Sequence, residues 1–218
     1  MNSIDKEIDV IGYNHIATSL ETPIRSDAFA ISDAKKIELI QHHFKEIMHI
    51  LGLDLSDDSL SGTPYRVAKM YVKEVFSGLN PANKPAATLF ENKYEYNEML
   101  IEKDITLFSY CEHHFVPIIG KVHIAYISNG QVIGLSKINR LVQYFAKRPQ
   151  VQERLTNQIA EGLKQALQSD DIAVIIDAVH LCVSSRGIKD TNTSTITAHY
   201  SGKFQDEKTK TAFITLIK

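Results

Sequence analysis

Two short segments hold the residues best suited to chemistry, Cys111-Glu112-His113-His114 and, far downstream, His180-Leu181-Cys182. The chain has only 2 cysteines, and each has histidines within three residues. Two thiolates and one imidazole form a good ligand set for zinc, and catalytic zinc sites typically keep three protein ligands and leave a fourth position for water. The pattern predicts Cys111, His114 and Cys182 as zinc ligands, with His113 and His180 beside the metal as acid–base groups. This arrangement indicates metal-assisted hydrolysis.

Other roles for the two cysteines stay open at this point. They could form one disulfide, or they could be buried structural thiols. The segment Met1–Ile11 carries scattered charges and lacks the unbroken apolar core of a signal peptide. No stretch approaches the roughly 18 apolar residues of a membrane span. We therefore expect a cytoplasmic protein with free or metal-bound thiols and no membrane partner.

Length and charge limit the remaining possibilities. A chain of 218 residues is one ordinary domain, or one domain with an extension. Its 24 Lys and Arg nearly balance its 26 Asp and Glu, so the surface as a whole gives no sign of a nucleic-acid partner. An anionic substrate would need a local basic cluster. We predict an N-terminal arm (1–31), a helical region (32–96) and a catalytic domain (97–218).

The helical region contains two helices by its apolar periodicity. Ser32 can cap the first, which Gly52 ends. Its apolar face comprises Ile37, Ile40, Phe44, Ile47, Met48 and Leu51. The second opens at Thr63-Pro64, in the preferred order of cap and first-turn proline, and ends at Gly78. Its apolar face comprises Val67, Met70, Tyr71 and Val75. The span Asn80–Tyr96 is loop-like.

The pattern then changes to period two. A strand containing Ile105 and Leu107 leads into Cys111, and the next strand has its own alternating set, Val122, Ile124 and Tyr126. Asn129-Gly130 is the strongest short hairpin signal, and it predicts Val132–Leu135 as the return strand.

Two further helices follow this hairpin. Ser136 can cap the first, and Pro149 lies near the start of the second. Their inward-facing residues are Ile138, Leu141, Val142 and Phe145 in the first, and Val151, Leu155, Ile159, Leu163 and Leu167 in the second.

The rest of the chain is expected to be strands. A strand over Ile172–Ser184 would place His180 and Cys182 on one face, because strand side chains alternate sides. Thr193–Tyr200 and Thr211–Ile217 are expected as closing strands. The order predicts an α+β fold, an antiparallel sheet with two long helices on one face.

A polar group accompanies the two metal segments. Ser136, Lys137 and Arg140 occupy the first turn and a half of a predicted helix, and a helix N-terminus with a hydroxyl and two cations suits phosphate. Arg186 follows Cys182 by four residues. Glu153 could accept two hydrogen bonds from guanine, through N1–H and the 2-amino group, whereas adenine lacks that pair. For any one of these residues, a solvated surface charge is the plainer interpretation.

These residues lie within a longer resemblance. CEHHFVPIIGKVHIAYISNGQVIGLSKINRLVQYFAKRPQVQERLTNQIA, HLCVSSRGIKDTNTSTIT and the upstream TPYRVAKMYVKEVFSGL resemble the GTP cyclohydrolase I family over roughly residues 33–204. The resemblance implies the tunnelling fold (T-fold), in which subunits join their sheets into a barrel, as a homodecamer with active sites between subunits. It implies a zinc-dependent, GTP-binding hydrolase that converts GTP to 7,8-dihydroneopterin triphosphate and formate, the first step of tetrahydrofolate (one-carbon) or pterin biosynthesis.

The resemblance also implies a role for each matching position. Cys111, His114 and Cys182 match zinc ligands; His113, His180 and Ser136 match groups that move protons; Gln152 and Glu153 match a guanine-recognition pair; Lys137, Arg140 and Arg186 match contacts to the triphosphate and ribose; and Arg66 matches a phosphate-facing arginine of a neighbouring subunit.

Two alternatives remain at this stage. A sibling enzyme of the same fold, such as a pterin synthase or a nitrile-reducing homologue, would share the scaffold, but the intact GLSK-x-x-R motif and Arg186 favour a triphosphate. A non-catalytic zinc-stabilised module would need a closed four-ligand site, and His113 could supply the fourth ligand. The sequence does not predict a feedback regulatory partner.

Overall fold

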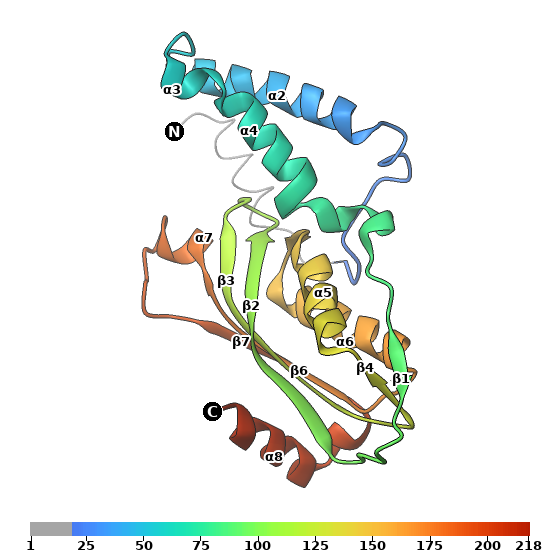
Figure 1. Ribbon diagram of the computed structural model, residues 1–218. Helices are drawn as coiled ribbons and strands as arrows, with labels where there is room; N and C mark the ends of the chain where they lie inside the picture. Colours follow the sequence, from blue (N-terminus) through green and yellow to red (C-terminus); the bar gives the residue numbers. More distant parts are fainter. Residues whose placement is uncertain (1–18) are drawn as a thin grey trace.

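The computed structural model of the protein describes residues 19–218, which form a curled sheet with two long helices against it and two further helices above its upper end (Figure 1). The predicted arm, 1–31, therefore lies largely outside the described residues. The proposed division of the chain at residues 31 and 96 stays a prediction.

The helices of the described chain are α2 (Asp33–Ile50), α3 (Asp58–Ser61), α4 (Thr63–Met70), α5 (Leu135–Ala146), α6 (Gln152–Leu167), α7 (Leu181–Ser184) and α8 (Glu207–Ile217). A π-helical turn, Tyr71–Val75, continues α4, and single 3₁₀ turns cover Ser77–Leu79, Pro81–Asn83 and Gly202–Gln205. The strands are β1 (Leu89–Glu91), β2 (Met99–Cys111), β3 (Pro117–Ile127), β4 (Gln131–Ile133), β5 (Pro149–Gln150), β6 (Ile172–His180) and β7 (Thr195–Tyr200).

The main sheet has five strands in the order β5-β2-β3-β6-β7. All neighbours are antiparallel except β5, which pairs parallel to the end of β2 through Cys111 and Gln150. A bulge between Glu102 and Ile105 interrupts the β2–β3 ladder. The predicted α+β class with a largely antiparallel sheet is confirmed.

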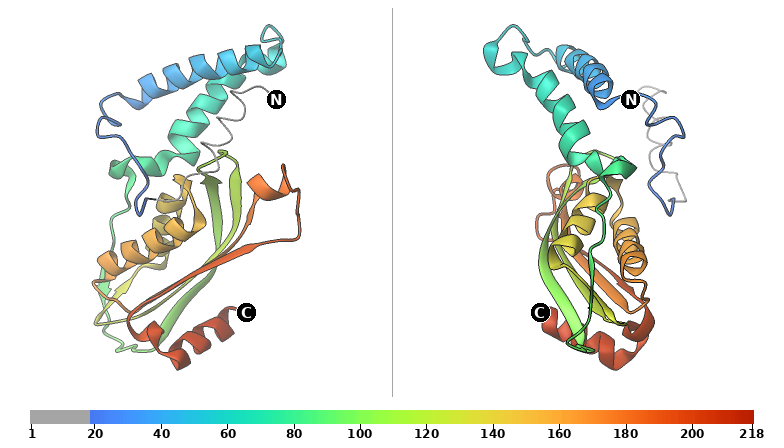
Figure 2. Two further views of the ribbon diagram at one scale, coloured as in Figure 1. Left: turned by 180° about the vertical axis from the view of Figure 1, so that it is seen from behind. Right: turned by 45° about the vertical axis from the view of Figure 1, so that its right-hand side comes forward.

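Both faces of this sheet are partly covered, as the side views in Figure 2 show. Along β3, Ile124 and Tyr126 face a core formed with α5 and α6, whereas Ala125 and Ile127 face a second, smaller core with α8. The period-two alternation of apolar residues thus fills both sides. The two long helices predicted on one face, α5 and α6, share one core, and α8, where a strand was predicted, covers part of the other face.

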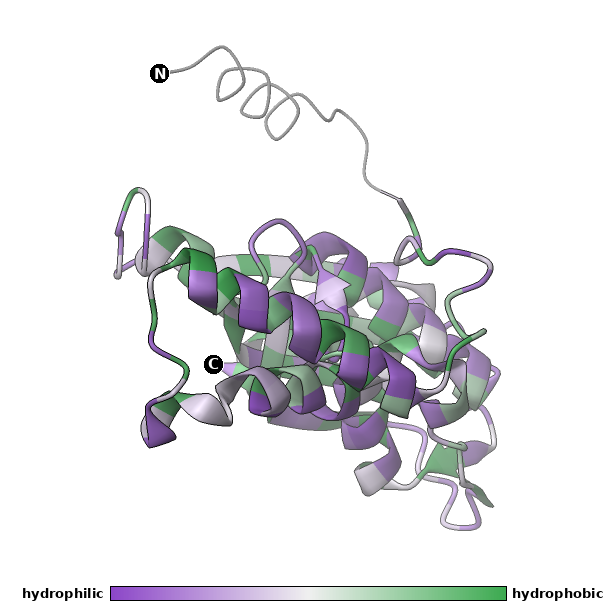
Figure 3. Ribbon diagram, turned by 90° about the horizontal axis from the view of Figure 1, so that it is seen from above, coloured by the Kyte–Doolittle hydropathy of each residue, from purple (hydrophilic) through white to green (hydrophobic). Residues whose placement is uncertain are grey.

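The helices are amphipathic, so each can turn an apolar side toward the core. In Figure 3 they carry apolar residues on part of their circumference and polar residues on the rest. The side chain of Ser32 caps α2 by accepting a hydrogen bond from the backbone N–H of Lys35, as predicted. No helix among residues 19–218 is long and apolar enough to cross a membrane.

The predicted return strand is wrong in its partner. The chain does turn at Asn129-Gly130, but β4 does not pair with β3 as a hairpin would. It pairs instead with β1, with Leu89 opposite Ile133, and β1 lies in the span Asn80–Tyr96 that was predicted as a loop. Both lateral positions of β3 are already taken by β2 and β6, so no ladder position is left for a hairpin partner.

Three helix starts differ from the predictions. Gly62, not Thr63, is the N-cap of α4. Gly134 is the N-cap of α5, so Ser136 lies inside the first turn and does not cap it. Pro149 belongs to β5, because its residue pair adds to the β2 ladder before α6 begins at Gln152.

Of the strands predicted in the C-terminal part of the chain, one extends too far and another is a helix. The strand β6 ends at His180, and Cys182 lies in the one-turn helix α7, so the two side chains do not share a strand face. Thr211–Ile217 is part of α8, which Asp206 caps by accepting from the N–H of Thr209 and which buries Phe213 against Phe204. Capping and burial outweigh the β-propensity of its threonines and isoleucines. The strand predicted over Thr193–Tyr200 is confirmed as Thr195–Tyr200.

Candidate active site

One end of the main sheet gathers most of the predicted site. The strand β2 ends at Cys111, and β6 ends at His180, which pairs with Ile118 near the start of β3. The parallel pairing of Cys111 with Gln150 brings the N-terminus of α6 to the same place. Strand register therefore positions two distant segments of the sequence side by side.

Cys111, His114 and Cys182 form a compact group of metal-ligand atoms. Their Sγ and imidazole nitrogen atoms all lie within 4.8 Å of one another. With Zn–S near 2.3 Å and Zn–N near 2.0 Å, ligand atoms of a tetrahedral zinc site lie roughly 3.3–3.8 Å apart. The Cys111 Sγ–His114 Nδ1 distance of 3.8 Å already meets this. Two thiolates and one imidazole at these separations are a donor set that fits a zinc ion.

No disulfide joins the two cysteines, since both are free thiols. Burial, and then the neighbouring Cys111, raise the pKa of the Cys182 thiol. Burial also lowers the pKa of the His114 imidazole, with smaller effects from Arg186 and His113. A neutral imidazole is the form that ligates a metal.

His113 and His180 flank this group. His113 Nδ1 lies 3.7 Å from Cys111 Sγ, and its Nε2 lies 3.8 Å from a carboxylate oxygen of Glu112. It is not a member of the mutually close ligand group. Burial lowers the pKa of His180, while the negative charge of Glu153 opposes the shift. Glu153 is exposed, so its carboxylate is available to a ligand.

The side chain of Gln152 lies within the protein. Its residue is 1% exposed, and its amide contacts β6, β7 and His180. Gln152 was predicted together with Glu153 as a guanine-recognition pair, yet only Glu153 faces solvent.

Sequence reasoning missed an ion pair in the metal-binding loop. Arg154, whose side chain is 3% exposed, donates to both carboxylate oxygens of Glu112, the residue between Cys111 and His113. Its Nε also donates to the carbonyl of Ser19. The detectable signal was the pair Arg154 and Gln158, polar residues four apart on the flank of an apolar helix face.

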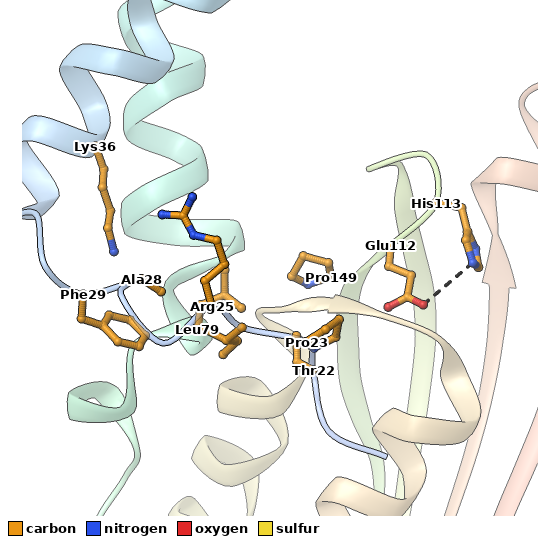
Figure 4. A pocket seen from close by; sticks show the side chains of 11 residues that line it. Thr22, Pro23, Arg25, Ala28, Phe29, Lys36, Leu79, Glu112, His113 and Pro149 are labelled. Atoms are coloured by element: carbon orange, nitrogen blue, oxygen red, sulfur yellow. Dashed lines mark ion pairs between the residues drawn. The ribbon is translucent and has the colours of Figure 1, made fainter. Parts of the chain in front are cut away.

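Gln158 makes the second link to the N-terminal segment, because its amide donates to a carboxylate oxygen of Glu21 at 2.9 Å. Residues 19–21 are thus attached to α6 by two hydrogen bonds. A cavity of about 580 Å³ lies between this segment and the metal-binding loop, with Arg25, Phe29, Lys36 and His113 among its lining (Figure 4).

The predicted phosphate-binding residues Ser136, Lys137 and Arg140 are not beside the metal group of the same chain. The helix α5 runs in the direction of β2, with contacts from Asn139 to Glu102 and, near its end, from Ser109 to Ala146. Lys137 lines a hollow together with Gln165 and Ala166, near the far end of α6, so the start of α5 lies roughly 20 Å from the metal end. The expected clustering beside the metal segments is therefore wrong within one chain.

The two remaining arginines differ in position. Arg186 is exposed and close enough to the metal group to lower the pKa of His114. Arg66 lies on α4 and folds back to the carbonyl of Ser59 at 3.4 Å. Figure 1 shows that α4, the helix that carries Arg66, extends away from the sheet.

Comparisons with known proteins agree on one family. The model of the GTP cyclohydrolase I family matches residues 40–218. The chain is 57% identical over 211 residues to GTP cyclohydrolase 1 of Flavobacterium johnsoniae, an alignment that covers 97% of this chain and 95% of the relative. It is 50% identical over 219 aligned positions to the proteins of the same name from Citrobacter koseri and Escherichia coli, which cover 100% of this chain and 99% of each relative.

Proposed function

Because the chain belongs to the GTP cyclohydrolase I family, we propose that it converts GTP and water to 7,8-dihydroneopterin triphosphate and formate. The reaction opens the imidazole ring of guanine at C8, releases that carbon as formate and recloses the ring with carbons of the ribose. Two hydrolytic cleavages and one dehydrating closure consume one water overall. The observation that carries the proposal is the convergence of Cys111, His114 and Cys182 beside two histidines.

Zinc is the proposed cofactor, held by Cys111, His114 and Cys182. Bound zinc supplies Lewis acidity, which makes a water molecule acidic enough to deliver its oxygen to C8 near neutral pH. Cys111 is buried and His114 is exposed, so the group opens toward solvent on one side. A substrate can approach from that side.

His113, His180 and Ser136 are the proposed proton carriers. His113 can protonate N7 of guanine, which makes C8 electrophilic. His180 can move protons during ring opening and closure, because it lies at the same end of the sheet. Ser136 can serve the later steps at the ribose, from the start of an α5 helix.

Different residues are proposed to bind the guanine base and the triphosphate of GTP. The exposed carboxylate of Glu153 can accept from N1–H and the 2-amino group of guanine. The resemblance assigns Gln152 to the same task. Lys137, Arg140, Arg186 and Arg66 are the proposed contacts to the triphosphate.

The distance between the metal end and the phosphate-binding residues of one chain favours an active site shared by two copies of the chain. Ser136 and Lys137, at the start of α5, lie roughly 20 Å from the metal end of their own subunit, and Arg140 lies one helical turn closer. This separation supports a site that takes the two groups from different copies. We propose a T-fold barrel assembled as a homodecamer, with active sites between subunits.

The cellular role follows from the product. A pterin triphosphate is the entry compound for tetrahydrofolate and one-carbon metabolism, or for other pterins, and we propose that the protein makes it in the cytoplasm.

Identification of the products tests the proposed reaction. Incubation with GTP should yield formate and dihydroneopterin triphosphate, which becomes a fluorescent pterin on oxidation, in a ratio of about one to one by the stoichiometry above. Formate without a pterin would reject ring closure as the outcome.

A further inference from the structure

The orientation of the Gln152 side-chain amide is fixed by the strands behind it. Its nitrogen Nε2 lies 2.8 Å from the carbonyl oxygen of Thr195 and 3.2 Å from that of Ile176. Carbonyl oxygens only accept hydrogen bonds, so the atom facing them must be the NH₂ group. The other end of the amide is therefore the oxygen.

A ring of hydroxyl hydrogen bonds supports the same orientation. Gln152 Nε2 also lies 3.1 Å from Thr197 Oγ1, which is 2.7 Å from Thr156 Oγ1, and Thr156 donates to the backbone carbonyl of Gln152. A hydroxyl carries one hydrogen, so Thr197 must donate to Thr156 and accept from Gln152. Every donor in the ring has an acceptor, and the side chain is held on both sides.

The oxygen Oε1 of this amide lies 2.7 Å from Nε2 of His180. An amide oxygen only accepts, so Nε2 of His180 must carry the hydrogen. In the neutral ring the lone pair is then on Nδ1. Among residues 19–218, Nδ1 of His180 makes no hydrogen bond to a side chain or to the backbone, so it is available to a ligand.

We propose that Gln152 is a positioning residue that fixes the tautomer and the ring orientation of His180, so that His180 exchanges protons with the substrate through Nδ1. This inference rests on the proposed function and gives the Gln152 side chain a task other than reading guanine. The guanine edge is then left to the carboxylate of Glu153.

Two observations separate this role from guanine recognition. Gln152 is 1% exposed, so its amide cannot reach a base without leaving its partners. Both amide atoms are already engaged by the protein, with three acceptors for Nε2 and one donor for Oε1. Glu153, the next residue, has the exposure that Gln152 lacks.

The first test needs no substitution. The zinc-loaded protein, labelled with ¹⁵N at histidine, is measured by solid-state NMR at pH 8, above the usual histidine pKa. The His180 signals are assigned by their absence in His180→Asn. We expect Nε2 protonated and Nδ1 unprotonated. A protonated Nδ1 beside an unprotonated Nε2 would overturn the inference.

The second test compares Gln152→Met with Gln150→Met. Gln150 is a matched control, because it is also a buried glutamine whose amide is bonded within the protein, yet it does not contact His180. Gln152→Met should keep full zinc content and a KM for GTP within about threefold, while kcat for formate falls on the order of 100-fold, as for loss of one acid–base group. Gln150→Met should keep kcat near the wild-type value.

The alternatives give different results. A raised KM with unchanged kcat, together with lost discrimination between GTP and ITP, would assign Gln152 to the base and overturn the inference. Unchanged kcat and KM would overturn it as well. If the wild-type protein releases no formate, the proposed function fails, and the catalytic part of the inference fails with it. A protonated Nδ1 in an active wild-type enzyme contradicts the inference alone. The NMR measurement on the wild-type chain decides the matter even if Gln152→Met does not fold.

Discussion

Arg154 and Glu112 form an ion pair that attaches the metal-binding loop to helix α6. The guanidinium donates to the two carboxylate oxygens at 2.6 and 3.3 Å, and its side chain is 3% exposed. Glu112 lies in the chain between Cys111 and His114, so the ion pair restrains the backbone that carries both predicted ligands. Such outer contacts orient metal ligands and affect metal affinity.

Removing this guanidinium should weaken both folding and metal binding. We expect Arg154→Met to lower the free energy of unfolding by about 3–5 kcal/mol, because the partly buried Glu112 carboxylate loses its partner. Zinc affinity should fall roughly 10- to 100-fold. Urea unfolding and competition with a zinc chelator measure the two effects.

The matched control for Arg154 is an exposed ion pair. Lys35→Met removes the partner of Glu38 on the surface of α2 and should change the unfolding free energy by less than about 1 kcal/mol. Equal effects of the two substitutions would contradict the restraining role of Arg154.

Cys182→Ser should abolish zinc binding and formate release together. A serine hydroxyl is a much weaker zinc ligand than a thiolate, and only two of the three proposed ligands would remain. Metal analysis and the formate assay on the same sample check this. Retained zinc at one ion per chain would show that Cys182 is not a ligand.

Glu153→Ala should weaken guanine recognition more than metal binding. The exposed carboxylate is proposed to accept two hydrogen bonds from guanine, and a site that loses such partners discriminates less between bases. The ratio of kcat/KM for GTP to that for ATP should fall by roughly 100-fold or more, with zinc content unchanged. An unchanged ratio would assign base recognition to other residues.

Acidification should destabilise the fold through His199, a partly buried histidine away from the metal. Burial lowers the pKa of His199, whose Nδ1 lies 3.0 Å from Asn157 Oδ1 and whose buried Nε2 has no hydrogen-bond partner among residues 19–218. With a folded-state pKa below the unfolded value, the unfolded chain binds more protons as the pH falls below about 6.5. Stability is therefore fully present above that pH and declines below it.

The measurement for His199 is the urea midpoint at pH 7.5 and pH 5.5. One such group contributes at most about 1.4 kcal/mol per pH unit. His199→Gln should reduce the difference between the two midpoints. The same pH dependence in wild type and variant would exclude His199 as a source of it.

The sequence was most informative where ligand spacing and helix periodicity carry the signal. The candidate ligand atoms of Cys111, His114 and Cys182 lie within 4.8 Å of one another, the proximity that the sequence pattern predicted. The three side chains converge although Cys182 lies in a helical turn that was expected to be a strand, and their role as metal ligands stays a prediction.

Elements decided by long-range packing were predicted less well. The pairing of β4 with β1 depends on β3 having both neighbours already, which no local pattern reveals. The C-terminal α8 depends on burial of Phe213 in the second core, which outweighs local propensity. The distance of Ser136 and Lys137 from the metal end follows from the direction of α5, and it could not be read from their position in the chain.

Formate release from GTP, with ATP as the control substrate and with zinc removed and then restored, tests the central claim most directly. The account predicts formate from GTP and not from ATP, its loss when a chelator removes the metal, and its return when zinc is added back. Absence of formate from a folded, zinc-loaded protein would contradict the assignment of this site to GTP hydrolysis.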